Sequence, residues 1–197
     1  MASKEDILEQ LVEEFLIHRD YFVRHNVKFL PRRDHPDFVS NQDSNHSDID
    51  VIGFNPKLTG PDRVWAVSCK SWQSGLNPAQ EIKNIQENKT IRGREAWRGF
   101  RELVVPKWSE AFIASVKEAT GEQTFTYVTA VTHLKGSAQV WEMHPQFISS
   151  MKGNPIKVIT LKEMLHEVSG ALSQTVAGTE FGRTLQLFKA AGIKLQD

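Results

Sequence analysis

Two short apolar segments separated by a breaker-rich stretch constrain this chain most strongly. Asp48–Phe54 and Arg63–Lys70 are rich in β-branched and aromatic residues, and each has the length of a strand. The stretch Asn55–Asp62 between them contains two prolines and a glycine, which favour a turn. The pattern predicts two neighbouring strands joined as a hairpin.

The rest of the chain predicts helices and strands on both sides of this hairpin. Apolar residues at helical spacing predict a helix over 4–19, and β-forming residues predict a strand over 21–30. Further strands are predicted at 124–134, 139–143 and 156–160, and helical segments at 78–91, 94–121, 144–151, 161–173 and 179–191. We expect an α/β fold with a mixed central sheet flanked by helices. One domain covers 1–197, and 161–197 form a C-terminal helical extension of it.

Composition and charge exclude several kinds of protein. Twenty-four Lys and Arg balance 24 Asp and Glu, which argues against a globally basic nucleic-acid binder. The single cysteine, Cys69, excludes a disulfide framework and a Cys-rich zinc site. Apolar runs fall far short of the roughly 20 residues of a membrane helix, and the acidic N-terminus does not resemble a signal peptide. We expect a cytoplasmic protein with no membrane partner.

Polar residues gather on the two hairpin strands. Since alternate residues of a strand face the same side, Asp48 and Asp50 share one face, with Ile49 and Val51 toward the core. Ser68 and Lys70 likewise share a face of the next strand. Carboxylates there could hold a hard divalent cation, and the ammonium group could stabilise charge on a phosphate. The alternative is a set of strand-end surface residues, or a structural ion pair between an aspartate and the lysine.

The order of these segments resembles a nuclease superfamily. A helix with glutamates, a strand, the segment SDIDVIG and the segment VWAVSCKSW are similar in order and spacing to the PD-(D/E)XK nucleases, over about residues 8–90. The resemblance implies a restriction-endonuclease-like fold with an αβββαβ core. It matches Asp50 to the motif aspartate, Lys70 to the motif lysine, and Glu14 (or Glu13) to the acid of the first helix.

The implied activity is hydrolysis of DNA phosphodiester bonds with Mg²⁺ or Mn²⁺. In this interpretation Asp50, Glu14 and Asp48 are metal ligands, and Lys70 orients the water and stabilises the phosphorus centre. Gln80, on the helix predicted at 78–91, resembles a glutamine that many of these nucleases have there.

The chain departs from the family pattern at position 68. The resemblance implies an acid there, and this chain has Ser68, a hydrogen-bonding residue. A replacement carboxylate would come from Asp48, or from Glu81 or Glu87 on the following helix. The alternative is that catalysis is lost and the fold binds nucleic acid or a protein partner.

Two further features bear on partners. Residues 83–117 contain eight bases and four acids, with Trp97 and Phe100 interleaved, which could follow a phosphate backbone. A solvated helix face explains these charges almost as well, and the aromatic residues also fit a core. Four apolar residues of the C-terminal segment either complete the core or form a homodimer interface: Leu185, Leu187, Phe188 and Ile193. DNA and a second copy of the chain are therefore the expected partners.

Overall fold

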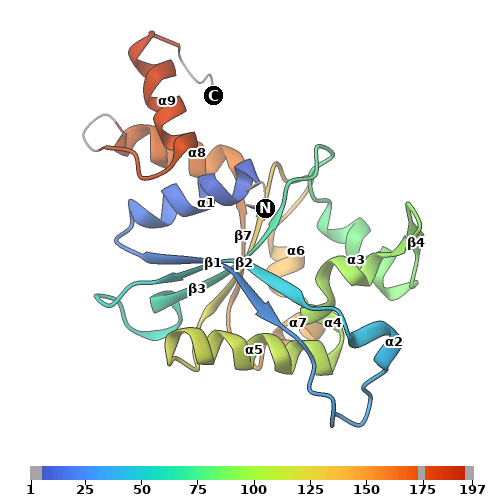
Figure 1. Ribbon diagram of the computed structural model, residues 1–197. Coiled ribbons are helices and arrows are strands. Elements are labelled where there is room, and N and C mark those ends of the chain that lie inside the picture. Colours follow the sequence, from blue (N-terminus) through green and yellow to red (C-terminus); the bar gives the residue numbers. More distant parts are fainter. Residues whose placement is uncertain (1–5, 173–175, 194–197) are drawn as a thin grey trace.

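A five-stranded mixed sheet forms the centre of the molecule (Figure 1). The computed structural model describes residues 6–172 and 176–193. The strand order is β1-β2-β3-β6-β7, where β1 is Phe22–Phe29, β2 Ser47–Phe54, β3 Val64–Lys70, β6 Thr126–Val131 and β7 Ile156–Thr160. The first three strands are antiparallel neighbours, and β6 and β7 are parallel to β3. The predicted hairpin of β2 and β3 is confirmed.

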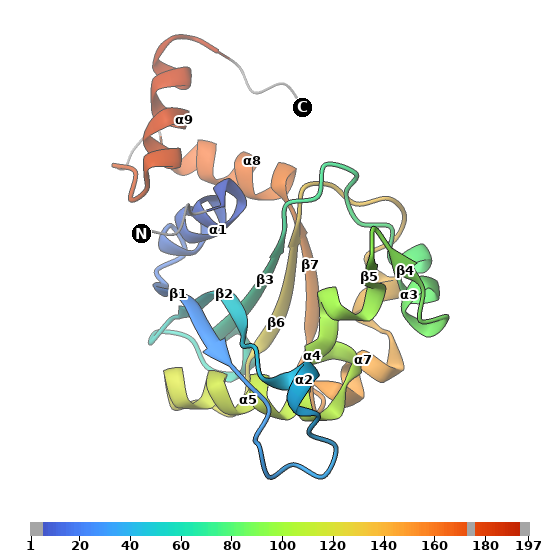
Figure 2. The same cartoon turned by 45° about the vertical axis from the view of Figure 1, so that its right-hand side comes forward.

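Helices cover both faces of the sheet (Figure 2). One face carries α1 (Ile7–Ile17) and α8 (Leu161–Ala171), with α9 (Glu180–Ala190) beyond them. The other carries α3 (Pro78–Gln86), α4 (Arg101–Val104), α5 (Pro106–Thr120), α6 (Gln139–Glu142) and α7 (Pro145–Ser150). Short turns of helix are α2 (Ser40–Asp43), η1 (Gly60–Arg63) and η2 (Ala96–Phe100). The predicted α/β architecture, a mixed sheet flanked by helices, is confirmed.

The core consists of two apolar clusters, one on each side of the sheet. Alternate residues of β3 separate into them, because Ala66 joins the cluster with α5 and Val67 joins the cluster with α1. Trp108 and Phe112 dominate the first cluster, where Phe29 packs edge-on against both rings. Each fully buried large side chain contributes about 1.5–3 kcal/mol, so these clusters fix the sheet between its helices.

The alternation of β2 differs from the prediction. Ile49 joins the cluster with α5, whereas Val51 joins the cluster with α1, so the expected common face is wrong. The β1–β2 ladder skips Asn26, which has a φ of 53°, and Asp50 opposite it. A left-handed residue interrupts the regular pleat, and the side chains beyond it change sides.

Two other segments correct the sequence prediction. The strand expected at 139–143 is the helix α6, where Trp141 is buried and Val140 and Met143 are exposed, so no alternating face is used. The helix expected over 78–91 ends at Gln86 and is followed by a small hairpin of β4 (Thr90–Ile91) and β5 (Arg94–Glu95).

The C-terminal extension packs against the first helix. Leu185 of α9 lies in the cluster with α1, whereas Leu187, Phe188 and Ile193 are exposed. Leu185 therefore completes the core, and a homodimer interface formed by the other three stays a prediction. In the described parts of the chain, no helix is both long and apolar enough to cross a membrane.

Candidate active site

A pocket opens where β2 and β3 separate. Their ladder pairs Val51–Phe54 with Val64–Val67 and goes no further, while β3 stays paired with β6 through Lys70. The carboxylate of Asp50 occupies the point of separation and accepts a hydrogen bond from the backbone N–H of Cys69 at 2.6 Å. Asp50 thus satisfies a donor that the neighbouring strand no longer reaches.

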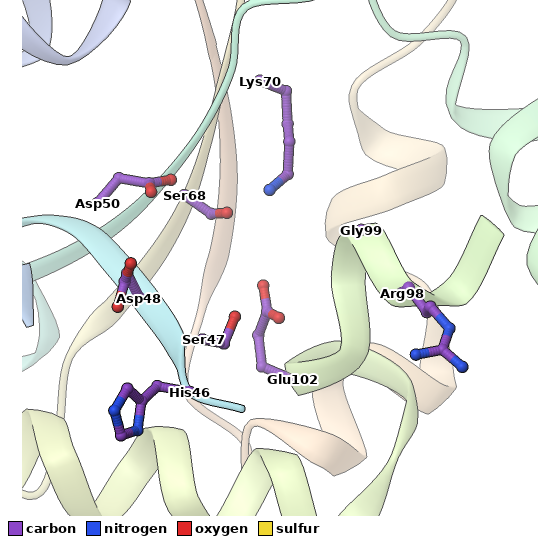
Figure 3. A pocket seen from close by; sticks show the side chains of 9 residues that line it. All are labelled: His46, Ser47, Asp48, Asp50, Ser68, Lys70, Arg98, Gly99 and Glu102. Carbon is purple, nitrogen blue, oxygen red and sulfur yellow. The ribbon is translucent and has the colours of Figure 1, made fainter. Parts of the chain in front are cut away.

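The pocket has a volume of about 280 Å³ and is walled by four elements (Figure 3). Asp50, Ser68, Glu102 and the amine of Lys70 turn toward a common space, while the side chain of Arg98 points away from it. The lining residues come from the start of β2, the end of β3, η2 and α4: His46, Ser47, Asp48, Asp50, Ser68, Lys70, Arg98, Gly99 and Glu102. The structure therefore brings together the predicted residues Asp48, Asp50, Ser68 and Lys70.

Glu102 of α4 is the pocket carboxylate that the sequence did not indicate. It is buried, and the hydroxyl of Tyr127 on β6 donates to its Oε1 at 2.6 Å. Burial raises the pKa of Tyr127 well above its usual value, and the negative charge of Glu102 adds to this, so the hydroxyl stays protonated. Ser68 also lies near that hydroxyl and acts to lower its pKa, so Tyr127 lies between Glu102 and the position of the missing acid.

Negative charge is concentrated around Asp50 in the pocket. Burial raises the pKa of Asp50, and the nearby charges of Glu102 and Asp48 raise it further. Lys70 and the Cys69 N–H act in the opposite direction. Asp50 and Glu102 face one space with Asp48 nearby, and a cation stabilises such a concentration of negative charge.

The amine of Lys70 is not held by a carboxylate. Its Nζ lies 5.2 Å from the centre of the Phe100 ring. Within residues 6–172 and 176–193, no ion pair at 4.0 Å or less joins it to Asp50 or any other acid. The structural ion pair between Asp50 and Lys70 is therefore absent from the described structure, and the ammonium group faces the pocket.

The donor set fits a hard divalent cation shared with a substrate. Asp50 and Glu102 each have one carboxylate oxygen engaged, by Cys69 and Tyr127, and the other oxygen unengaged by these bonds. No cluster of three or more His, Cys, Asp or Glu in the described residues is arranged to hold a metal by itself. Mg²⁺ is usually bound by one or two carboxylates, several waters and substrate phosphates, so two carboxylates beside an open pocket suit it.

Glu14, predicted as a metal ligand, lies elsewhere. It is fully buried on α1, and its carboxylate accepts hydrogen bonds from the N–H groups of Gly178 and Thr179 at 3.0 and 2.7 Å. The Thr179 hydroxyl donates to it as well, and His18 lies 3.0 Å away. A Cβ at Gly182 would stand 2.4 Å from its Oε2, so α9 approaches very closely. The expected role of Glu14 is corrected: these contacts anchor the start of α9, and the side chain does not line the pocket.

A Glu14→Ala variant should therefore lose stability at the C-terminal helix. It leaves two buried N–H groups without acceptors, and we expect the unfolding free energy to fall by about 2 kcal/mol. In this variant the amides of α9 should exchange faster than in the wild type, and exchange of the β3 amides should change less. Unchanged exchange in α9 would show that the contact contributes nothing to its docking.

The other predicted residues are not in the pocket. On α3, the Gln80 amide donates to Asn84 at 2.9 Å, and Asn84 donates to Glu81 at 3.3 Å. Glu87 lies 3.8 Å from Lys83, and Glu13 lies 3.2 Å from His25. Glu81, Gln80 and Glu87 are bound to their own helix, so the described geometry does not bring the expected replacement acid from α3.

The basic segment also divides into parts with different environments. Lys107 is buried and paired with Asp43, and Arg101 lies over the ring of Trp108. Arg98 pairs with Glu95.

Comparison of the chain with protein families, with curated proteins and with solved structures finds no match, so the geometry of the pocket carries the functional proposal.

Proposed function

We propose that this chain is a metal-dependent nuclease that hydrolyses DNA phosphodiester bonds. The observation that carries the proposal is the pocket in which Asp50, Lys70 and Glu102 surround Ser68. The Tyr127 hydroxyl, which donates to Glu102 and lies near Ser68, supports the assignment of Glu102 as the replacement acid.

The architecture supports the same proposal. A helix, three antiparallel strands, a helix and a parallel strand occur along the chain in the order α1, β1, β2, β3, α3 and β6. The short helices α2 and η1 are inserted among the first four, and the β4–β5 hairpin, η2, α4 and α5 are inserted between α3 and β6. Apart from these insertions, this is the αβββαβ order that the resemblance to PD-(D/E)XK nucleases implies, and we propose a restriction-endonuclease-like fold on that basis. Asp50 and Lys70 lie where two strands of this core separate.

In the proposed mechanism, Asp50 and Glu102 would hold Mg²⁺ or Mn²⁺, with Asp48 at the rim. When bound, such a cation polarises the phosphoryl group and lowers the pKa of a coordinated water. The Lys70 ammonium group donates to the phosphate oxygens and stabilises the charge that develops on them. Ser68 and Tyr127 keep the Glu102 carboxylate in place.

Hydrolysis then follows an ordinary in-line displacement. The oxygen of a water molecule forms a bond to phosphorus while the bond from phosphorus to one ester oxygen breaks. The attacking water gives a proton to solvent, and the leaving oxygen takes a proton from solvent, so the two transfers balance. In this mechanism Lys70 interacts with the phosphate and not with the bases, so its contribution is independent of base sequence.

A cleavage assay tests this function. The protein is incubated with supercoiled plasmid, linear duplex and single-stranded DNA in Mg²⁺, Mn²⁺ or EDTA, beside a Lys70→Met variant purified in parallel. We expect nicking or linearisation in Mg²⁺ or Mn²⁺, none in EDTA, and none beyond the EDTA level from the variant. Equal cutting by the variant would identify a contaminant, and DNA binding without any cutting would favour the inactive, nucleic-acid-binding alternative.

A further inference from the structure

The hairpin of β4 and β5 lies at the edge of the molecule, next to α3 (Figures 1 and 2). Its turn is formed by Arg92 and Gly93, with φ angles of 51° and 80°, as two-residue hairpin turns require. The ladder pairs Thr90 with Glu95 and Ile91 with Arg94, and the Ala96 N–H donates to the Lys89 carbonyl at 2.9 Å. The arm is therefore a regular hairpin closed at its base.

Three cations stand on this arm without acidic partners. Lys89, Arg92 and Arg94 are exposed, as is every residue from 86 to 94. None of the three takes part in an ion pair with another described residue at 4.0 Å or less. The nearby acid Glu87 is paired with Lys83 instead. The fold thus presents positive charge on an element that contributes no buried side chain.

The arm is joined directly to the pocket wall. Glu95, the last residue of β5, forms an ion pair with Arg98, and Arg98 and Gly99 line the pocket. The same short helix η2 ends at Phe100, which packs beneath the amine of Lys70. The arm and the wall of the pocket are therefore joined through the Glu95–Arg98 pair and through η2.

The dimensions of the arm suit duplex DNA. Three residues on each side of the turn extend about 10 Å at 3.3 Å per residue. The major groove of B-DNA is about 12 Å wide and 8.5 Å deep and admits a two-stranded ribbon without deformation. The minor groove is about 6 Å wide, so a ribbon enters it only where the protein bends and widens the DNA. Lysine and arginine side chains on such a ribbon reach phosphates and base edges on both walls of the groove.

We infer that the β4–β5 hairpin enters the major groove of duplex DNA next to the phosphate held in the pocket. The inference rests on the proposed function for the pocket but concerns how the substrate is recognised. It commits the chain to double-stranded DNA, because A-form RNA has a deep, narrow major groove that side chains do not read.

Binding without cleavage tests the inference. Fluorescence anisotropy in EDTA measures the affinity of the protein for a DNA duplex of about 30 bp over a range of salt concentrations. The arm variant carries Lys89→Gln, Arg92→Gln and Arg94→Gln. A matched variant changes three exposed lysines on elements that do not line the pocket: Lys117→Gln, Lys152→Gln and Lys162→Gln. Each lost phosphate contact reduces the magnitude of the slope of log K against log salt by about 0.9. The slope of the arm variant should therefore be smaller in magnitude by about 2 to 3, and the slope of the matched variant should be unchanged.

A second duplex locates the groove. Bulky groups on the C5 position of its pyrimidines fill the major groove and leave the minor groove open. We expect them to weaken binding of the wild type about tenfold and to change binding of the arm variant little. The inference is overturned if the salt slope of the arm variant is unchanged, or if the matched variant loses as much of its slope as the arm variant does. It is also overturned if the C5 groups do not weaken binding of the wild type, or if single strands or RNA bind more tightly than the duplex. These outcomes are separate from the cleavage assay, since plasmid cutting can persist when the arm contributes nothing.

Discussion

DNA cleavage by a Glu102→Gln variant is expected to be about 100- to 1000-fold slower than cleavage by the wild type, the usual effect of removing one preorganised electrostatic group. Glutamine keeps the size of the side chain and an acceptor for the Tyr127 hydroxyl, which donates to Glu102 at 2.6 Å. It removes only the negative charge that would hold the cation. The initial rate of plasmid nicking in saturating Mg²⁺ measures the effect.

Glu81→Gln is the matched control, because Glu81 is the acid expected on the helix after Lys70 and lies outside the pocket. It should cleave at the wild-type rate. The reverse pattern, with Glu81→Gln inactive and Glu102→Gln active, would refute the assignment of Glu102. Tyr127→Phe tests positioning: it should raise the Mg²⁺ concentration needed for half the maximal rate about tenfold, and lower the saturated rate less.

An Asp43→Ala variant is expected to lose about 3 to 5 kcal/mol of unfolding free energy. Asp43 is buried and accepts hydrogen bonds from Lys107 Nζ at 2.5 Å, the Trp108 indole at 3.1 Å and the Val39 N–H at 2.8 Å. Its removal leaves the ammonium group of Lys107, itself buried, with only the Asp37 carbonyl. Urea unfolding followed by tryptophan fluorescence gives the free-energy difference.

The same group makes stability depend on pH. Burial by itself raises the pKa of Asp43, but the hydrogen bonds from Lys107, Val39 and Trp108 outweigh it and hold the pKa below the ordinary 3.8. A lowered pKa in the folded state means that the stabilisation is present above pH 3.8 and is lost as the pH falls through the folded-state pKa. The wild type should therefore lose stability on acidification more steeply than Asp43→Ala. The double variant Asp43→Leu/Lys107→Met should recover much of the unfolding free energy that Asp43→Ala loses. If the double variant were as destabilised as Asp43→Ala, the unpaired charge of Lys107 would not be the cause.

The sheet was largely predictable because its strands follow local rules. Alternating β-branched and aromatic residues marked β1, β2, β3, β6 and β7, and the breakers before Arg63 marked the β2–β3 connection. The hairpin of β4 and β5 was missed because its residues are polar and exposed, so no alternation of burial exists to detect. Its one signal is Arg92-Gly93, which suits a turn with two positive φ angles and lies between the helical segments expected at 78–91 and 94–121.

The pocket was predictable only where its residues belong to adjacent strands. The antiparallel pairing of β2 with β3 places four predicted residues beside one another: Asp48, Asp50, Ser68 and Lys70. Glu102 arrives from α4, and its place beside Ser68 depends on Tyr127 of β6, so three distant segments must be folded before the relation exists. The same reason explains Glu14, whose partners at Gly178 and Thr179 no local pattern could reveal.

That long separation has a consequence for how the chain is synthesised. Glu14 leaves the ribosome long before Gly178 and Thr179, the two residues whose N–H groups bind it, which follow 164 and 165 positions later. Until they emerge, His18 is the partner of the carboxylate that the nascent chain already contains, at 3.0 Å. Burying the carboxylate then costs free energy that is offset only in part, so α1 docks on the sheet with one carboxylate oxygen unsatisfied or waits in water. Contacts of such sequence separation form late and slow folding. The nascent domain should therefore stay open along the α1 face, and sensitive to proteases there, until Thr179 is outside the exit tunnel.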